Sequence, residues 1–286
     1  MGNQACGPEP IEELKATCLD RNNATIRAAQ ARVPTLQQDS HLLHETWSKF
    51  EQDVAKGYIG QPQELDTVYL SEILLVDSFG VWEKHAGTSW KVRVINNFRY
   101  NAVNSYAWVP ARMHYDNFTE LMEAAKVLKS TVAGNLVLGK SDFKSAFKTL
   151  PTDGNQAWLS WCLVYNPSRG RHQVAPLKSQ SFGSLGAVMA WYRTAMLIQK
   201  VLQDLFFLTT FVYVDDCFWV TLSYQGGNGP NAAWQACAFQ YVVEELSGVE
   251  IRPHQNRGGG NDYAARVTDA YGTRGVDVAP EPRQGC

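Results

Sequence analysis

The 286-residue sequence lacks any continuous apolar run long enough to cross a membrane, which takes about 18 residues or more. Its first residues, MGNQACGPEPIEELKATC, also lack the basic and then apolar stretches of a secretory signal peptide. They come close to a myristoylation pattern, but Cys6 stands where that pattern has a small hydroxyl residue. We therefore expect an intracellular protein, cytoplasmic or nuclear, with no membrane partner.

The sequence also lacks paired cysteines. Zinc sites and disulfide frameworks use cysteines at short, regular spacings. The six cysteines of this chain are instead scattered, with no C-x-x-C pair: Cys6, Cys18, Cys162, Cys217, Cys237 and Cys286. This pattern argues against both kinds of site and favours reduced thiols.

A strong net charge is absent as well, since the chain carries only −2. The distribution is nevertheless uneven. Lys and Arg number 6 against 13 Asp and Glu in residues 1–83, 15 against 5 in residues 84–200, and 5 against 10 in residues 201–286. A basic central segment suits a phosphate-rich partner bound at one face. Charge blocks also arise by chance, so this asymmetry is supporting evidence only.

The apolar content of 45% is that of an ordinary globular protein, and the length suits one large domain or two modest ones. A polar, Ala-rich composition predicts a weakly anchored helix over residues 10–32. Hydrophobic periodicity predicts an amphipathic helix over 43–54, with Asp39 or Ser40 as its N-cap. Further helices are predicted over residues 118–128, 184–206 and 231–247. Strands are predicted over residues 67–83, 90–96 and 136–142, as a hairpin over 156–165 and 171–180, and as two strands within 208–222. This order indicates an α+β fold with helices backing an antiparallel sheet.

The segment FVYVDDCFWV (residues 211–220) is the sharpest chemical feature. Two apolar stretches flank Asp215 and Asp216, which places the acids at a hairpin turn. Adjacent carboxylates repel each other unless a cation compensates, and Mg²⁺ prefers such hard oxygen ligands. An exposed turn is the alternative interpretation, because Asp is common in turns.

A second acid lies 73 residues earlier, in LVLGKSDFKSAFKTLP (residues 136–151). Here a predicted strand ends at Asp142. Two-metal phosphoryl transfer needs carboxylates from separate strands converging on two cations about 4 Å apart. Asp142 and Asp215 would supply that arrangement if their strands are neighbours. Taken alone, Asp142 is better explained as a strand-end acid that satisfies a turn.

These two segments, with two others in collinear order, resemble the motifs of reverse transcriptases. DFKSAFKTLP and YVDD are similar to motifs A and C, QSFGSLGAVMAW (180–191) to motif B, and WKVRVINNFRYNAVN (90–104) to a segment of the fingers. KGYIGQP (56–62) resembles a run found ahead of the fingers in retrotransposons of the tyrosine-recombinase type. The resemblance covers roughly residues 45–255 and implies a right-hand polymerase palm with partial fingers and no thumb.

The resemblance implies four parts of the chain. These are an N-terminal polar and helical extension (1–38), a fingers-like region (39–135), a palm with motifs A, B and C (136–255) and an irregular C-terminal tail (256–286). It also implies roles for single residues. Two Mg²⁺ ions, or Mn²⁺, would be bound by the catalytic Asp142, Asp215 and Asp216 with the carbonyl of Phe143. The incoming nucleotide would contact Lys91, Arg93, Phe147, Phe182 and Gly183, and the primer end would lie near Tyr213 and Val214.

The residues themselves support two of these assignments, that of Lys91 and Arg93 and that of Gly183, whereas the role of Phe147 rests on the resemblance. Lys91 and Arg93 alternate with apolar residues in a predicted strand, so they should share a face toward the triphosphate. Phe147 would act as a steric gate against a ribose 2′-OH, although an ordinary core aromatic is the alternative. Gly183 would allow backbone to approach the nucleotide closely.

The sequence departs from the family pattern in several places. Ser181 stands where the family has Pro, Ser184 follows Gly183 in place of Leu, and Asn97 replaces an Asp. No Lys follows Lys200, although motif D should supply one within residues 246–260 to protonate the leaving pyrophosphate. Arg252 and His254 stand in that segment, but an Arg has too high a pKa to donate a proton readily.

The expected function is therefore an RNA-directed DNA polymerase domain of a retroelement, which adds dNTPs to a primer on an RNA or DNA template. The alternative is a catalytically inactive palm domain derived from a retroelement, which at most binds nucleic acid. An RNA-dependent RNA polymerase is disfavoured by Phe147. The sequence does not predict an oligomeric state.

Overall fold

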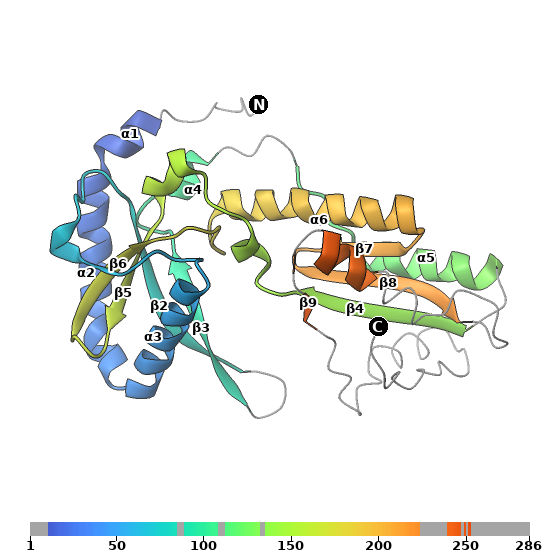
Figure 1. Cartoon of the computed structure of the whole chain (residues 1–286), viewed down its shortest axis with the longest axis horizontal. Coiled ribbons are helices and arrows are strands. Elements are labelled where there is room, and N and C mark those ends of the chain that lie inside the picture. The colour runs from blue at the N-terminus through green and yellow to red at the C-terminus, as the bar shows by residue number, and fades with distance from the viewer. Residues whose placement is uncertain are drawn as a thin grey trace, which may run out of the picture. The chain divides into compact units, whose positions relative to one another are not determined.

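The computed structural model describes residues 11–84, 89–107, 112–131, 135–223, 239–246, 249 and 251–252 (Figure 1). Its contacts divide the chain into two units, each formed by two separate stretches of sequence. Unit 1 consists of Met1–Arg112 and Phe147–Ala190, and unit 2 of Met113–Ala146 and Trp191–Cys286. No helix in the described ranges is long and apolar enough to span a membrane.

Unit 1 is built on a mixed five-stranded sheet with the strand order β1-β6-β5-β2-β3. The strands are β1 (Gln63–Glu64), β2 (Leu75–Lys84), β3 (Trp90–Asn97), β5 (Trp161–Asn166) and β6 (Arg171–Pro176). The described residues of this unit form α1 (Ile11–Ala16), α2 (Cys18–Gln37), α3 (Ser40–Ala55) and α4 (Val103–Tyr106), together with the start of a helix at Leu185. Its 3₁₀ turns are η1 (Leu65–Thr67), η3 (Gly154–Leu159) and most of η2 (Ala146–Thr149).

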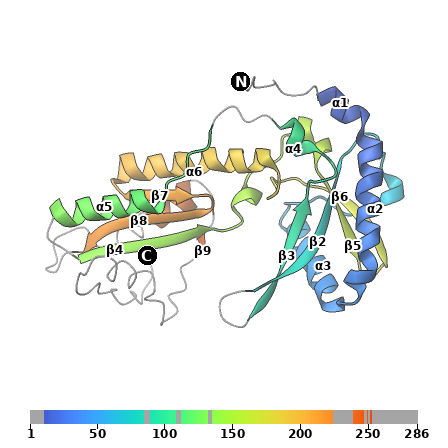
Figure 2. The same ribbon diagram turned by 180° about the vertical axis from the view of Figure 1, so that it is seen from behind.

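The two long helices of unit 1 cover opposite faces of this sheet. Ala29 of α2 packs with Leu163 of β5, whereas Phe50 of α3 packs with Cys162 and Val164, the neighbours of Leu163 in the same strand. Alternate strand residues point to opposite faces. Figure 1 shows α3 in front of the sheet, and Figure 2, from behind, shows α2 on the other side. Burial on both faces explains why β5 is an uninterrupted apolar run.

The sheet of unit 1 differs from the antiparallel sheet expected from the sequence, because β2 and β5 run parallel. Leu75 pairs with Trp161 and Val76 with Cys162, while the other neighbouring strands are antiparallel. The α+β composition is confirmed as a mixture of helices and sheets. The parallel pair joins segments some 85 residues apart, so no local turn signal could reveal it.

Two strand predictions in unit 1 were too long. The strand expected over 67–83 begins only at Leu75, since the carbonyls of Leu70 and Ile73 accept hydrogen bonds from Asn22 of α2 rather than from a strand. The hairpin is confirmed only over β5 and β6. The Asp153 carboxylate accepts a hydrogen bond from the Asn155 N–H, which starts η3 in the region assigned to the first strand.

Helix α2 is firmly anchored, contrary to the sequence expectation. Asn22 is fully buried, with its Nδ2 2.7 Å from the carbonyl oxygens of both Leu70 and Ile73, and its Oδ1 2.7 Å from the N–H of Leu75. One turn from the end of the helix, Arg32 makes a bidentate ion pair with the buried Asp77 at 3.0 and 2.6 Å. The polar face of α2 therefore contacts β2 and the loop before it.

We expect Asn22→Ala to lower the free energy of unfolding by about 3 kcal/mol. Two buried backbone groups and one half-buried group would lose their partner at once, and each unsatisfied buried group costs about 1–3 kcal/mol before relaxation. Urea unfolding followed by circular dichroism measures the change. The neighbouring half-buried Asn23, changed to Ala, is the control and should cost far less. Equal losses in the two variants would contradict the anchoring role.

Helix α3 begins where the sequence predicts, with Asp39 as its N-cap. One Asp39 carboxylate oxygen accepts a hydrogen bond from the N–H of Leu42 at 2.9 Å, and the other accepts one from Nε1 of Trp82 in β2 at 2.7 Å. The bond from Trp82, followed by that from Leu42, lowers the pKa of Asp39 below its usual value. The cap thus fastens α3 to the sheet as well as closing its first turn.

Because the pKa of Asp39 is lowered in the folded state, its contribution to the free energy of unfolding is complete above the pKa of the unfolded chain. That contribution is lost as pH falls through the folded pKa, below about pH 4. We expect Asp39→Asn to be less stable than wild type at pH 7, with the difference shrinking below about pH 4. Unfolding curves at pH 7 and pH 3 measure this. Asp20→Asn, at an exposed acid of α2, should show no such convergence. A gap that stays constant with pH would contradict the assignment.

Unit 2 contains an antiparallel four-stranded sheet with the order β7-β8-β4-β9. Its strands are β4 (Asn135–Phe143), β7 (Thr209–Tyr213), β8 (Asp216–Ser223) and β9 (Ile251–Arg252). The helices are α5 (Phe118–Thr131), the greater part of α6 (Leu185–Phe206) and a π-helical turn, η4 (Tyr241–Leu246). The predicted helices over 118–128 and 184–206, the strand over 136–142 and the strand pair within 208–222 are all confirmed. Of the predicted helix 231–247, residues 231–238 and 247 lie outside the described residues.

One face of this sheet packs against α5. Leu121 and Ala125 of α5 form a buried cluster with Val220 of β8, and half-buried side chains from three strands complete it: Leu136, Leu138, Phe211 and Phe218. Alternate residues of a strand point to opposite faces, and the spacing of these residues along their strands puts them all on one face. Trp219, at an alternate position of β8, belongs to the opposite face, and its ring stacks on that of Phe239 with ring centres 4.9 Å apart.

Candidate functional site

The hairpin between β7 and β8 holds the YVDD sequence at its turn. Tyr213 pairs with Asp216 across the hairpin, which leaves Val214 and Asp215 as the two turn residues. Val214 has φ 56°, a left-handed conformation that is unusual for a β-branched side chain. The carbonyl oxygen of Val214 accepts a hydrogen bond from Nε1 of Trp191 in α6 at 2.6 Å, which holds the turn in this conformation.

Strand β4 brings Asp142 beside this hairpin. Asp142 lies directly opposite Asp216 in the β4–β8 ladder, and the N–H of Phe143 donates to the carbonyl of Asp215 at 3.0 Å. Directly opposed residues of an antiparallel pair project to the same face, with Cβ atoms about 5 Å apart. The structure therefore gathers the three predicted acids at one end of the sheet, as their sequence pattern predicts for neighbouring strands.

Lys140 is a member of this acidic site that the sequence interpretation missed. It lies two residues before Asp142 in β4, on the same face, and its Nζ is 2.8 Å from a carboxylate oxygen of Asp216. Its ammonium group offsets part of the repulsion among the acids. The sequence does show a Lys two residues before an Asp at a strand end, which places both side chains on one face of the strand. Only the strand pairing shows that this Lys faces Asp216 of another strand.

Carboxylate oxygens are the ligands that Mg²⁺ and Mn²⁺ prefer, so the donor types at this site fit such ions. The side-chain arrangement is less complete. Within the described ranges, no group of three or more His, Cys, Asp or Glu side chains is placed to hold a metal ion. The Asp216 carboxylate contacts Lys140, so a site that uses all three acids requires Asp216 to exchange that cation for the metal.

Tyrosine side chains border the acids in unit 2. The ring of Tyr115, just before α5, lies 5.6 Å from that of Tyr213 and 5.1 Å from that of Tyr192 in α6. Burial, followed by the nearby hydroxyls of Tyr192 and Tyr213 and the charge of Asp215, raises the pKa of Tyr115. Tyr213 is expected near the primer from the family resemblance, whereas Tyr115 and Tyr192 were not selected from the sequence.

The predicted nucleotide-binding residues lie in unit 1 and come together there. Lys91 and Arg93 do share a face of β3, and both pair with Glu83 of β2, at 3.0 and 3.2 Å. The hydrogen bond from Lys91 is the main reason why the pKa of Glu83 is lowered, with Arg93 adding to it. The Arg93 guanidinium also lies 5.3 Å from the ring centre of Phe182.

Phe182 and Phe147 meet edge to face, with ring centres 5.4 Å apart, but they differ in exposure. Phe182 is 53% exposed, whereas Phe147 is only 8% exposed. Gly183 has φ 108°, and a Cβ at this position would lie 2.8 Å from the carbonyl oxygen of Asn96. The glycine is therefore required by backbone geometry, independently of any nucleotide.

Two asparagines of the segment 90–104 hold the motif B backbone in place. Asn104 donates from Nδ2 to the carbonyl of Gly183 and accepts from the N–H of Leu185, both at 2.8 Å. Asn96 donates to the hydroxyl of Ser181 at 2.6 Å. Ser181 thus has a hydrogen-bonding role at the position where the resemblance predicts Pro.

The residue predictions therefore separate into two groups that each come together within one unit. Unit 2 holds Asp142, Phe143, Tyr213, Val214, Asp215 and Asp216, and unit 1 holds Lys91, Arg93, Phe147, Phe182 and Gly183. The backbone of Arg252 pairs with Asp142 through β9, which brings the motif D segment beside β4. His254 and most of the segment 246–260 lie outside the described residues.

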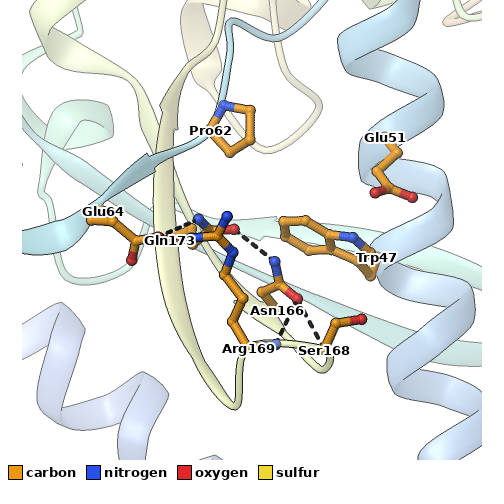
Figure 3. A pocket seen from close by; sticks show the side chains of 8 residues that line it. All are labelled: Trp47, Glu51, Pro62, Glu64, Asn166, Ser168, Arg169 and Gln173. Atoms are coloured by element: carbon orange, nitrogen blue, oxygen red, sulfur yellow. Dashed lines mark hydrogen bonds and ion pairs between the residues drawn. The ribbon is translucent and has the colours of Figure 1, made fainter.

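A cavity of about 510 Å³ also lies in unit 1, between α3 and the turn that joins β5 to β6 (Figure 3). None of the predicted site residues lines it. Trp47 and Glu51 border it from α3, and Glu64 and Arg169 form an ion pair on the opposite side. Glu64 also pairs with Arg171 at 3.0 Å and accepts from Gln173 at 2.9 Å, so both arginines share this one carboxylate as their partner.

Comparison with known proteins does not show which family this chain belongs to. No protein-family model matches the chain, and no curated protein sequence matches it. The family resemblance read from the motifs therefore stays a prediction.

We expect Gly139→Ala to destabilise unit 2 by about 1–3 kcal/mol, the usual cost of overpacking. Gly139 lies in β4, three residues before Asp142, and a Cβ there would lie 1.9 Å from the Trp219 ring. That ring is stacked on Phe239, so moving it away from the added Cβ would also disrupt the stacking. Thermal unfolding measures the effect. Gly154→Ala is the matched control, because nothing lies within 4 Å of its Cβ position. Equal stability of the two variants would contradict the close contact between Gly139 and the Trp219 ring.

Proposed function

We propose that this chain is a nucleotidyltransferase of the reverse-transcriptase type, the RNA-directed DNA polymerase domain of a retroelement. The observation that carries the proposal is the register of β4 against β8, which sets Asp142 opposite Asp216 with Asp215 at the adjoining turn. Convergence of acids from separate strands is what two-metal phosphoryl transfer demands. The collinear order of the four sequence motifs supports the same function.

The proposed reaction joins a dNTP to the 3′-hydroxyl of a primer paired with an RNA or DNA template. Asp142, Asp215 and Asp216, with the Phe143 carbonyl, would hold Mg²⁺ or Mn²⁺, which would activate the hydroxyl and neutralise the leaving pyrophosphate. Lys91 and Arg93 supply positive charge on one face for the triphosphate. Phe147 and Phe182 supply an aromatic pair for the sugar and base, with Phe147 as the proposed gate against ribonucleotides.

A second candidate function is a nucleic-acid-binding palm without catalysis. The ion pair between Lys140 and Asp216 favours it, because this contact withdraws one acid from the metal site. Such a protein would still bind primer and template through its aromatic and basic side chains. The two candidates differ in one observable, the Mg²⁺-dependent incorporation of dNTPs.

We expect the purified chain to extend a DNA primer on an RNA template in the presence of Mg²⁺. Asp215→Asn and Asp142→Asn should each lower the rate on the order of 100-fold or more, since each removes a carboxylate that would bind the metal ions on which the reaction depends. Incorporation of labelled dNTPs in single turnover measures the rate. Asp204→Asn, at an exposed acid of α6 paired with Lys200, is the control and should leave the rate unchanged.

Circular dichroism should show the same fold in all three variants. Wild-type activity in folded Asp215→Asn would exclude the proposed metal site. Tight primer–template binding by the wild type, with no incorporation at any Mg²⁺ or Mn²⁺ concentration, would instead establish the non-catalytic candidate.

A further inference from the structure

An aromatic cluster in unit 2, Tyr115, Tyr192 and Tyr213, lies beside the acidic turn. Tyr115 meets Tyr192 edge on, with an interplanar angle of 82°, and is tilted by 57° against Tyr213. Tyr213 is 56% exposed and Tyr115 is half-buried. The cluster thus presents aromatic surface to solvent at the end of β7, one residue before the Val214–Asp215 turn.

The position of Tyr115 is set by bonds on both sides of it in the chain. The hydroxyl of Tyr192 accepts from the N–H of His114 at 3.1 Å and donates to its carbonyl at 3.0 Å. A carboxylate oxygen of Asp116 accepts from the N–H of Val212 in β7 at 2.9 Å and from Nε2 of Gln199 at 2.6 Å. The backbone before and after Tyr115 is therefore tied to α6 and to β7.

This anchoring fixes the place of the Tyr115 ring in unit 2. Asp116 is a charged group held against the sheet, and its bond to Val212 takes an edge N–H of β7 that water could otherwise satisfy. What the arrangement achieves is a ring held at a fixed place beside Tyr213, which itself pairs with Asp216. Preorganised aromatic side chains lose little conformational entropy when a ligand stacks on them.

We propose that Tyr115, together with Tyr213, forms a stacking platform for the terminal nucleotide of the primer, with Tyr192 and Asp116 as positioning residues. The inference rests on the proposed function, because that function places a primer end beside the acids. Nucleobases stack on aromatic rings whatever their sequence, which suits a surface that must accept every primer end. Tyr115 supplies the ring, and the hydroxyl is not required for this contact.

The test uses a DNA primer with 2-aminopurine at its 3′ end, annealed to an RNA template, without Mg²⁺ or dNTPs. Stacking on an aromatic ring alters the fluorescence of the 2-aminopurine. The wild type should change this signal on binding, Tyr115→Phe should keep the change, and Tyr115→Ala should lose most of it. Affinity in Tyr115→Ala should fall about tenfold, within the range for one stacked base.

The controls separate stacking from folding. Tyr115→Leu keeps apolar volume against Tyr192, so it should retain the thermal stability of the wild type and still lose the fluorescence change. Tyr69→Ala, at a tyrosine of unit 1 that is 77% exposed, should behave as wild type. A full fluorescence change in folded Tyr115→Ala or Tyr115→Leu would overturn the proposal.

The same experiment distinguishes this inference from the proposed function. A fluorescence change that depends on Tyr115, in a chain that never incorporates dNTPs, would support the platform and refute the polymerase. Normal incorporation, with a fluorescence change that Tyr115→Ala leaves intact, would refute the platform alone. A wild-type chain that binds no primer–template would refute both.

Discussion

The antiparallel pairing of β4 with β8 is the constraint on which the candidate catalytic site depends. Apolar side chains of one parity, among them Leu138 and Val220, pack against α5. That burial selects the register, because a slip of one residue would turn every one of these side chains away from the helix. The same register sets Asp142 opposite Asp216 rather than opposite Cys217. The hydrophobic packing of α5 therefore decides, through the pleat of the sheet, which charged groups meet at its far end.

Internal ion pairs occupy both groups of candidate residues. Asp216 is paired with Lys140 in unit 2, and Lys91 and Arg93 are paired with Glu83 in unit 1. Each pair is half-exposed, so solvent screens it and it adds little to stability. A metal ion or a triphosphate would compete with these contacts at small cost. The partners hold the charged side chains near their proposed working positions and limit repulsion among like charges when no ligand is bound.

The sequence predicted local elements well and long-range pairing poorly. The helices α3, α5 and α6 were predicted from periodicity and the cap at Asp39. The parallel contact between β2 and β5 was not, because it depends on segments far apart that carry no signal of one another. The weak anchoring expected of α2 was wrong for a related reason. Its polar residues, Asn22 above all, look like a solvated face until their backbone partners in another segment are known.

By itself, the sequence determined that Asp142 lies at the end of a strand, that Asp215 lies in a hairpin turn, and that Lys91 and Arg93 share one face. It placed Asp216 in the turn as well, whereas Asp216 is the first residue of β8 and pairs with Tyr213. These results follow from short-range rules: the two-residue period of strands and the clustering of polar residues in turns. Only the tertiary structure decided that the strand of Asp142 lies beside that hairpin, that Lys140 contacts Asp216, and that Tyr115 stands next to Tyr213. Such neighbours depend on how the sheet and helices bury their apolar faces together, which is a property of the whole unit and not of any one segment.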